Sequence, residues 1–392
     1  MRAWLEQRVL ITVGTGGVGK TTVAAAIALE GARQGKRVLV LTIDPARRLA
    51  DALGIGELGH EPRVIPPQAL REAGLEGPGE LSAMMLDTKR TFDELVARYA
   101  PNEEARVRIL ANPIYRNLTD ALAGSREYSA LERLHQLHGT GQYDLIVVDT
   151  PPSTHAIEFL EAPRRLTGFL ESQFLKLLFR PALAMGRTGF RLFRLGSATV
   201  LRVMEKLSGL EFLMAISEFL LAFEGMLEGF TRRSQEIETL LHDRSCGFVL
   251  VVGPEPEQVR RAEAFWRRLC EERIHLLGVI VNRMRVWPGG GAAPELDRGC
   301  AARLTRWLEQ VLRRDGLGEP ATSIARHVVE TLQQQAALAR RDAVQARALT
   351  DELALSSDSL RCIPLYAEDV HALEGLARMS THLFKESTSV GI

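Results

Sequence analysis

The sequence has only four cysteines, and their positions exclude the usual cysteine-based sites. They are far apart and none belongs to a CxxC pair, the spacing that four-ligand zinc sites use. A disulfide framework is equally unsupported, so we expect scattered buried thiols. His135 and His138 are close in the sequence, but without a third ligand such a pair is typical of structural or solvated histidines. No cysteine or histidine metal site is predicted.

Long apolar runs and an excess of either charge are also missing. No stretch approaches the roughly 18 uncharged apolar residues of a membrane span, and Met1–Gln7 lacks the apolar core of a secretory signal. We therefore expect a cytoplasmic chain with no transmembrane segment. Lys+Arg and Asp+Glu are equal at 49 each, so net charge does not indicate nucleic acid, and no nucleic-acid partner is expected.

The sequence does have a glycine-rich segment between a predicted strand and a predicted helix. The apolar run Val9–Val13 predicts a buried strand, residues 22–29 predict a helix, and the GxxxxGK[ST] spacing between them predicts a P-loop. Glycines let backbone N–H groups approach phosphate oxygens. Lys20 is expected to neutralise the β- and γ-phosphates, and Thr21 to bind Mg²⁺. The alternative is a strand-to-helix turn without a ligand. The predicted nucleotide-binding residues here are Gly14, Thr15, Gly16, Gly17, Val18, Gly19, Lys20, Thr21 and Thr22.

A second apolar strand over 37–43 completes a strand–helix–strand unit, which predicts a parallel sheet with helices on both faces. At 392 residues, the length fits about two to three domains or one large α/β domain with an insertion. We predict a doubly wound α/β core made of 1–87, 141–164 and 243–392, and a helical subdomain made of 88–140 and 165–242. Within these ranges, the apolar periodicity predicts strands over 81–87, 143–149, 247–253, 276–282 and 361–365, and helices over 255–273, 296–314, 321–355 and 369–384. Residues 55–80 are predicted to be a loop around the short apolar piece Val64–Ile65.

Two acidic residues end predicted strands, at the edge where a parallel sheet collects its ligands. Asp44 either caps the next helix, with Pro45 at the first helical position, or accepts a hydrogen bond from the water that attacks the γ-phosphate. The two roles are compatible. Asp149 is expected to reach Mg²⁺ through a water, although an ordinary turn could also follow its strand. Residues 150–155 would then face the γ-phosphate and sense ATP against ADP.

Two further features leave alternatives open. Asn282 ends the strand 276–282, where a carboxamide suits the adenine edge, or else caps a turn. Residues 165–230 are rich in Phe and Met at helical spacing, basic in the first part and acidic in the second. Such faces are typical of a subdomain core or a dimer contact, and equally of a groove for an apolar client helix or of a membrane-surface segment.

Five motifs, taken in the order in which they occur along the chain, resemble those of the arsenite-pump ATPase (ArsA) family. This family includes the cytosolic ATPases that deliver tail-anchored proteins to membranes. The motifs are Gly14–Thr22, Asp44–Ala46, Asp149–His155, Val281–Asn282 and Ile363–Leu365. The resemblance covers about residues 9–384. It implies a mainly parallel sheet with a helical subdomain, and a homodimer whose two nucleotide sites face each other. It also implies that Asp44 positions the water, that Asn282 contacts adenine, and that the segment after Pro364 closes around the base.

The chain departs from the family pattern in two places. Thr15 stands where members usually have a lysine that reaches the partner's phosphates, and Arg47 or Arg48 is the candidate substitute. The paired cysteines with which the targeting factors bind zinc between subunits are also absent, so a zinc-bridged dimer is not expected. Because the sequence has one P-loop, a composite site requires two chains.

These features predict a Mg²⁺-dependent ATPase that couples ATP binding and hydrolysis to movement of a helical subdomain that handles a client or partner. One alternative is a nucleotide-gated chaperone or targeting switch for apolar helices with very low turnover. Another is the catalytic subunit of an anion pump, although clustered thiols for arsenite are missing. A partitioning ATPase shares the P-loop, but the long helical region disfavours it.

Overall fold

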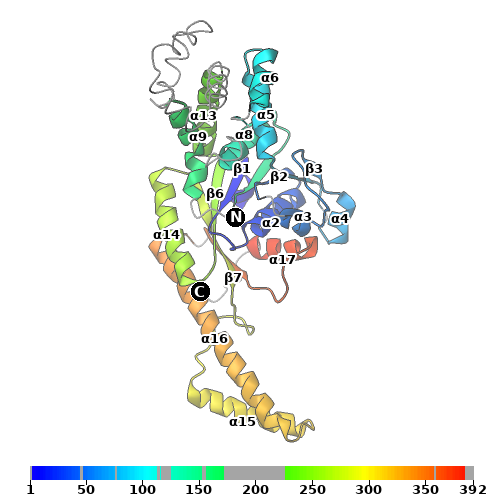
Figure 1. Cartoon of the computed structure of the whole chain (residues 1–392). Helices are drawn as coiled ribbons and strands as arrows, with labels where there is room; N and C mark the ends of the chain where they lie inside the picture. Colours follow the sequence, from blue (N-terminus) through cyan, green and yellow to red (C-terminus); the bar gives the residue numbers. More distant parts are fainter. Residues whose placement is uncertain are drawn as a thin grey trace, which may run out of the picture.

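The structure is a computed structural model that describes residues 2–44, 47–75, 77–112, 115, 125–151, 156–171, 226–356 and 359–384. Its centre is an eight-stranded sheet with the order β3-β4-β2-β5-β1-β6-β7-β8 (Figure 1). All neighbouring strands are parallel except β3, which runs antiparallel to β4. The strands are β1 Val9–Val13, β2 Arg37–Thr42, β3 Arg63–Val64, β4 Glu80–Met85, β5 Leu145–Asp149, β6 Cys246–Val252, β7 Leu276–Met284 and β8 Leu360–Pro364.

Helices cover both faces of this sheet, so the predicted doubly wound α/β fold is confirmed. The described helices are α1 Arg2–Leu5, α2 Lys20–Arg33, α3 Arg48–Ala52, α4 Pro67–Glu72, α5 Thr88–Tyr99, α6 Glu103–Ala111, α8 Ser125–Thr140, α9 Ala156–Glu171, α13 Leu227–His242, α14 Pro256–Glu271, α15 Arg298–Arg314, α16 Pro320–Glu352 and α17 Leu373–Phe384. Within the described ranges, none of these helices combines the length and the apolar character needed to cross a bilayer.

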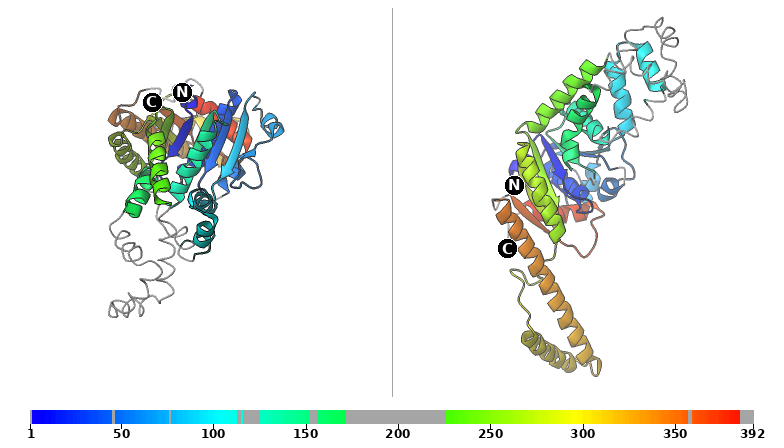
Figure 2. Two further views of the ribbon diagram at one scale, coloured as in Figure 1. Left: turned by 90° about the horizontal axis from the view of Figure 1, so that it is seen from above. Right: turned by 60° about the vertical axis from the view of Figure 1, so that its left-hand side comes forward.

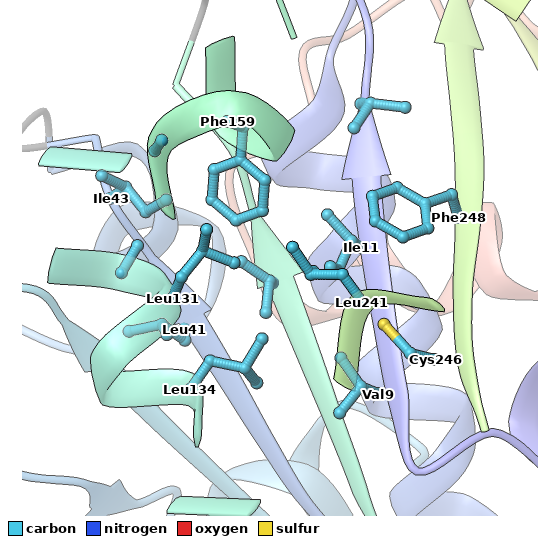
Figure 3. Close-up of a cluster of buried hydrophobic side chains, with 14 of the residues drawn as sticks. Val9, Ile11, Leu41, Ile43, Leu131, Leu134, Phe159, Leu241, Cys246 and Phe248 are labelled. Carbon is cyan, nitrogen blue, oxygen red and sulfur yellow. The ribbon is translucent and has the colours of Figure 1, made fainter. Parts of the chain in front are cut away.

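Two apolar cores lie on opposite faces of the sheet, because successive side chains of a strand point to opposite sides. In β1, Val9 and Ile11 belong to one core and Leu10 to the other. The first core also takes side chains from α8, α9, α13 and α14, and Figure 3 shows Phe159 and Phe248 packed in it. The second core takes side chains from α2, α3 and α17. The central strands are therefore buried on both faces, as their continuous apolar sequences predict.

Several local predictions are wrong. Residues 55–80 contain the helix α4 and the short strand β3 as well as loop. Strand β7 continues to Met284, two residues beyond Asn282. Helix α3 begins at Arg48 with Arg47 as its N-cap, so Asp44 is not at the N-cap position, and Pro45 lies outside the described residues. Of the four cysteines, only Cys246 is buried, whereas Cys270 is exposed and the other two are half-buried.

The helices α5, α6, α8, α9 and α13 gather at one end of the molecule (Figure 1). Within this group, the fully buried carboxylate of Glu132 on α8 lies 3.2 Å from the guanidinium of Arg233 on α13, which ties the two helices together. Most of the Phe- and Met-rich stretch 165–230 lies outside the described residues. The division into core and helical subdomain, and the choice between a core and a client groove, therefore stay predictions.

Helices α15 and α16 form an antiparallel hairpin that extends from the body of the molecule, at the end away from α5 and α6 (Figure 2). Both helices are predicted from the sequence, but their pairing into a projection is not. The side chain of Gln333 donates a hydrogen bond to the carbonyl of Leu296 at 3.0 Å, and Thr322 donates one to Glu309 at 2.6 Å. These contacts fix the register of the hairpin.

Candidate functional site

The segment between β1 and α2 has backbone conformations that glycine adopts most readily. Gly14, Gly17 and Gly19 have φ angles of 150°, 79° and 87°, in the region where a side chain is strained. A Cβ on Gly14 would lie 2.0 Å from the carbonyl oxygen of Val251, and one on Gly19 would lie 2.5 Å from Nδ2 of Asn282. The loop is therefore packed tightly against β6 and β7, and its glycines are required by conformation and by space.

Lys20 is the first residue of α2 and its side chain turns back into the loop. The ammonium group donates hydrogen bonds to the carbonyls of Gly14 and Thr15, both at 3.0 Å, and the residue is only 6% exposed. Burial lowers the pKa of Lys20, while the nearby carboxylates of Asp149 and Asp44 raise it. The ammonium group of Lys20 is thus held inside the loop by the loop's own carbonyl groups.

The strand order brings the predicted acids to this loop. Strand β5 lies between β1 and β2, and Asp149 at its end is level with Thr12 of β1 and Thr42 of β2. The Thr42 hydroxyl donates to Oδ2 of Asp149 at 2.9 Å and accepts a hydrogen bond from the N–H of Asp44 at 3.3 Å. Because the strands are parallel, their carboxyl ends deliver Lys20, Asp44 and Asp149 to the same edge of the sheet.

Asp149 has the properties expected of an Mg²⁺ site, although the side chain is deeply buried. Its Oδ1 is buried and accepts no hydrogen bond from the part of the chain that the structure describes. The Thr21 hydroxyl is close enough to influence the carboxylate. A hydroxyl beside a carboxylate oxygen with a free lone pair is a donor set that suits Mg²⁺, which prefers oxygen ligands. The residues therefore fit the predicted ion.

Burial also gives Asp149 an unusual titration. It raises the pKa of this carboxyl to about 6 from an ordinary value of 3.8, although Thr21, Thr42 and Lys20 act to lower it. The folded chain therefore favours the neutral carboxyl more than the unfolded chain does. Ionising the buried carboxyl therefore lowers the free energy of unfolding. This cost is absent below about pH 4 and reaches its full size above about pH 6, and a shift of about two pKa units corresponds to about 3 kcal/mol.

We expect Asp149→Asn to raise the free energy of unfolding of the nucleotide-free, Mg²⁺-free protein at pH 8 by up to about 3 kcal/mol, because it removes a buried charge and keeps the shape. The gain should shrink as the pH falls through 6 and vanish near 4. Urea unfolding of both proteins in EDTA across this range measures it. A gain that is independent of pH would contradict the assignment of the buried charge.

Asp44 lies just beyond β2 and is partly buried. One of its carboxylate oxygens is 3.9 Å from the guanidinium of Arg48, whose side chain is largely exposed. Arg47, the other candidate for replacing the missing lysine, pairs with Glu57 at 3.0 Å on the surface. The structure thus puts Asp44 beside the loop, and its role as the residue that positions water stays a prediction.

Asn282 contacts the P-loop directly. Its Nδ2 donates to the carbonyl of Val18 at 2.7 Å, and its Oδ1 accepts from the N–H of Arg283 at 2.9 Å. The residue is 3% exposed, and one N–H and one lone pair of its carboxamide remain for other partners. Pro364 ends β8 and is level with Met284 of β7. Both predicted base-binding residues therefore lie on adjacent strands, and their contact with adenine stays a prediction.

Arg283 is a candidate site residue that sequence reasoning missed. Its φ angle is 61°, and the pairing of β7 with β8 shifts between Val281 and Met284, as at a bulge, which redirects a side chain. The redirected guanidinium donates to the carbonyl of Gly17 at 2.9 Å. A second cation thus lies on the P-loop. The available signal was an arginine immediately after the polar end of a strand.

The remaining predicted residues are less completely placed. The hydroxyl of Thr15 is buried and has no hydrogen-bond partner among the described residues. Thr150 is buried and its hydroxyl donates to the carbonyl of Thr12 at 2.7 Å. Residues 152–155, most of the predicted γ-phosphate sensor, lie outside the described residues. The four cysteines form no cluster, and the described parts hold no group of three or more potential metal-binding side chains.

The chain is similar in sequence to known proteins. A family described as anion-transporting ATPase matches residues 7–290. The chain is 28% identical over 321 residues to a protein named ATPase get3 from Neurospora crassa, covering 79% of this chain and 84% of that protein. It is 31% identical over 174 residues to a putative arsenical pump-driving ATPase from Halobacterium salinarum, covering 42% of this chain. That match spans only 25% of the haloarchaeal protein's length.

Proposed function

The chain belongs to the anion-transporting ATPase family, and on that premise we propose that it binds and hydrolyses ATP at the loop between β1 and α2. The observation that carries the proposal is the convergence of Lys20, Asp44 and Asp149 on one sheet edge, with the Thr42 hydroxyl hydrogen-bonded to the Asp149 carboxylate and to the backbone N–H of Asp44. Membership also confirms the resemblance drawn from the motifs. Hydrolysis in the cytoplasm, in a homodimer whose composite site needs two chains, is part of the same proposal.

The chemistry would depend on positioning and electrostatics. Loop N–H groups and Lys20 would hold the β- and γ-phosphates, and Asp44 would accept a hydrogen bond from the attacking water and turn its lone pair toward phosphorus. Thr21 and Asp149 would hold Mg²⁺, with Asp149 bound through a water. The ion neutralises phosphate charge when it is bound. Preorganised groups of this kind supply most of the rate enhancement in phosphoryl transfer.

The proposed cycle would move the helical subdomain and so handle a client or partner. The Thr42 hydroxyl, which contacts the Asp149 carboxylate and the backbone N–H of Asp44, supports this, since a shift of either strand end on nucleotide binding would disturb the other. Phosphate release in the presence of ATP tests turnover. Light scattering with and without ATP tests dimerisation in the same samples. Undetectable phosphate release with undetectable ATP binding would overturn the proposal.

A second candidate function is a nucleotide-gated binding switch for apolar helices with very low turnover. It is favoured by Thr15, which removes the cation that the family pattern would supply to a partner's phosphates. ATP binding without phosphate release, together with an apolar client that is lost when ATP is added, would favour this candidate. Stimulation of turnover by arsenite or antimonite would instead favour the anion-pump subunit.

Arg283→Ala is expected to raise the KM for ATP about tenfold with little change in kcat, because it removes a charge-assisted hydrogen bond to the carbonyl of Gly17 and a cation from the loop that would hold the phosphates. Steady-state phosphate release gives both constants. Arg261→Ala is the control, since Arg261 is exposed on α14 and pairs with Glu257 of the same helix. Unchanged KM in Arg283→Ala would remove Arg283 from the site.

A further inference from the structure

The projecting hairpin carries a concentration of exposed apolar side chains. Nine large apolar residues are exposed in the described part of the chain, and four of them are Trp307, Leu317, Ile324 and Val328. These four fall within the outer part of the hairpin, where α15 meets α16. The largest of the four side chains, Trp307, is 59% exposed. The hairpin lies beyond residue 290, where the match to the family model ends.

Three of these side chains lie on one side of the hairpin. The buried face of each helix is turned toward the other helix, and the hydrogen bond from Thr322 to Glu309, both half-buried, lies at one edge of that contact. Two residues along a helix correspond to a rotation of about 200°, so Trp307, two before Glu309, lies on the opposite side of α15. Ile324, two after Thr322, lies on the opposite side of α16, and Val328 follows it after one turn. We call this surface the Trp307 side.

The charges near the Trp307 side are positive. Arg303 and Arg314 are exposed and lie four residues before and seven residues after Trp307, on the same stripe of α15. The acids of this part of the hairpin lie elsewhere: Glu309 and Glu330 are on the other side, and Asp315 and Glu319 are at the turn. Glu309 is moreover engaged by Arg313 at 2.6 Å and by Thr322. The Trp307 side is therefore apolar and cationic, with no acid on it.

We propose that the Trp307 side docks on an anionic lipid surface, with Trp307, Ile324 and Val328 at the headgroup boundary and Arg303 and Arg314 against lipid phosphates. A helix face with tryptophan, aliphatic side chains and arginine, and without acids, is typical of interfacial segments. The hairpin would lie along the surface, since its turn carries Asp315 and Glu319, which an anionic surface repels. The hairpin projects from the body (Figure 2), and Trp307, Ile324 and Val328 on it are exposed.

A second copy of the chain fits this surface less well. In a two-fold contact through the Trp307 side, Arg303 and Arg314 would face the same residues of the other copy with no acid on either surface to offset them. A contact of three apolar side chains is also small beside the roughly 800 Å² per partner that a stable interface buries. A lipid surface supplies both the anionic charge and the apolar interior that a second copy of the Trp307 side would not supply.

The test is flotation of the full-length protein with vesicles of phosphatidylcholine, with and without phosphatidylglycerol. The double variant Arg303→Ala, Arg314→Ala should bind the anionic vesicles about tenfold less, and Trp307→Ala, Ile324→Ser should lose a similar amount. The matched control is Arg306→Ala, Arg326→Ala, which removes two exposed arginines from the polar side of the same two helices. At physiological salt the Debye length of about 8 Å is less than the thickness of a helix, so this control should bind within about twofold of the unmodified chain.

Binding to the anionic vesicles that falls with salt and is lost only in the variants of the Trp307 side supports the proposal. No flotation of the unmodified chain would overturn it, as would equal losses in the two arginine double variants. A molar mass that grows with concentration and returns to the monomer in Trp307→Ala, Ile324→Ser, without vesicle binding, would assign the surface to a second copy instead. Circular dichroism of each variant verifies that the hairpin is folded. The outcome is independent of ATP turnover.

Discussion

Replacing Lys20 with alanine is expected to lower ATP turnover by at least about a thousandfold and to weaken nucleotide binding. The ammonium group is the only lysine charge among the described residues of the loop, and its two hydrogen bonds to Gly14 and Thr15 hold it where phosphates would lie. A preorganised cation in a water-poor site is worth much more than one in water, because it opposes charge developing in the transition state without reorganisation. Phosphate release and calorimetry with ATP measure the two effects.

The matched control for this variant is Lys89→Ala. Lys89 is exposed on α5 and pairs with Asp93 one turn away at 2.7 Å, an interaction of small consequence on a helix surface. Turnover in Lys89→Ala should stay within about twofold of the unmodified chain. The Lys20 variant must also unfold cooperatively, which thermal denaturation verifies. A folded Lys20→Ala protein with undiminished turnover would show that ATP is hydrolysed elsewhere.

The parts of the fold that the sequence predicts are those set by local pattern. The strands β1, β2 and β5 are continuous apolar runs because both of their faces are covered, and this pattern is visible without coordinates. The convergence of Asp44 and Asp149 follows as well, since parallel strands place their carboxyl ends at one edge. Thr42, which connects the two acids, was not predicted, because a strand-end threonine carries no signal of its partners.

The features that the sequence does not predict depend on tertiary contacts. Arg283 reaches the P-loop only because β7 continues past Asn282 with an irregular register against β8, and a non-glycine residue with positive φ has no reliable sequence signature. The pairing of α15 with α16 is similar. Each helix has its own periodicity, but whether two helices form a projecting hairpin or pack on the sheet depends on the surfaces they meet. The exposure of Cys270 on α14 likewise depends on which face of that helix packs against the rest of the molecule.

Asp44→Asn is expected to lower the rate of hydrolysis by at least about a hundredfold while ATP binding is retained or becomes tighter. The amide keeps the size of the carboxylate but is a far weaker base, so it no longer draws the attacking water into place. Asp44 is close enough to Lys20 and Asp149 to shift the pKa of each. Removing its negative charge therefore also reduces repulsion of the incoming phosphates.

Binding and turnover together separate the possible roles of Asp44. Calorimetry with ATP and single-turnover phosphate release should show unchanged or improved affinity with slow chemistry, whereas Asp51→Asn, an exposed acid on α3, should leave both unchanged. Loss of ATP binding in Asp44→Asn would make Asp44 a structural support of the loop rather than the residue that positions water. If the unmodified chain binds ATP but releases no phosphate, it would behave like Asp44→Asn. The low-turnover switch would then be the better description, because the cycle would stop before the chemical step that Asp44 assists.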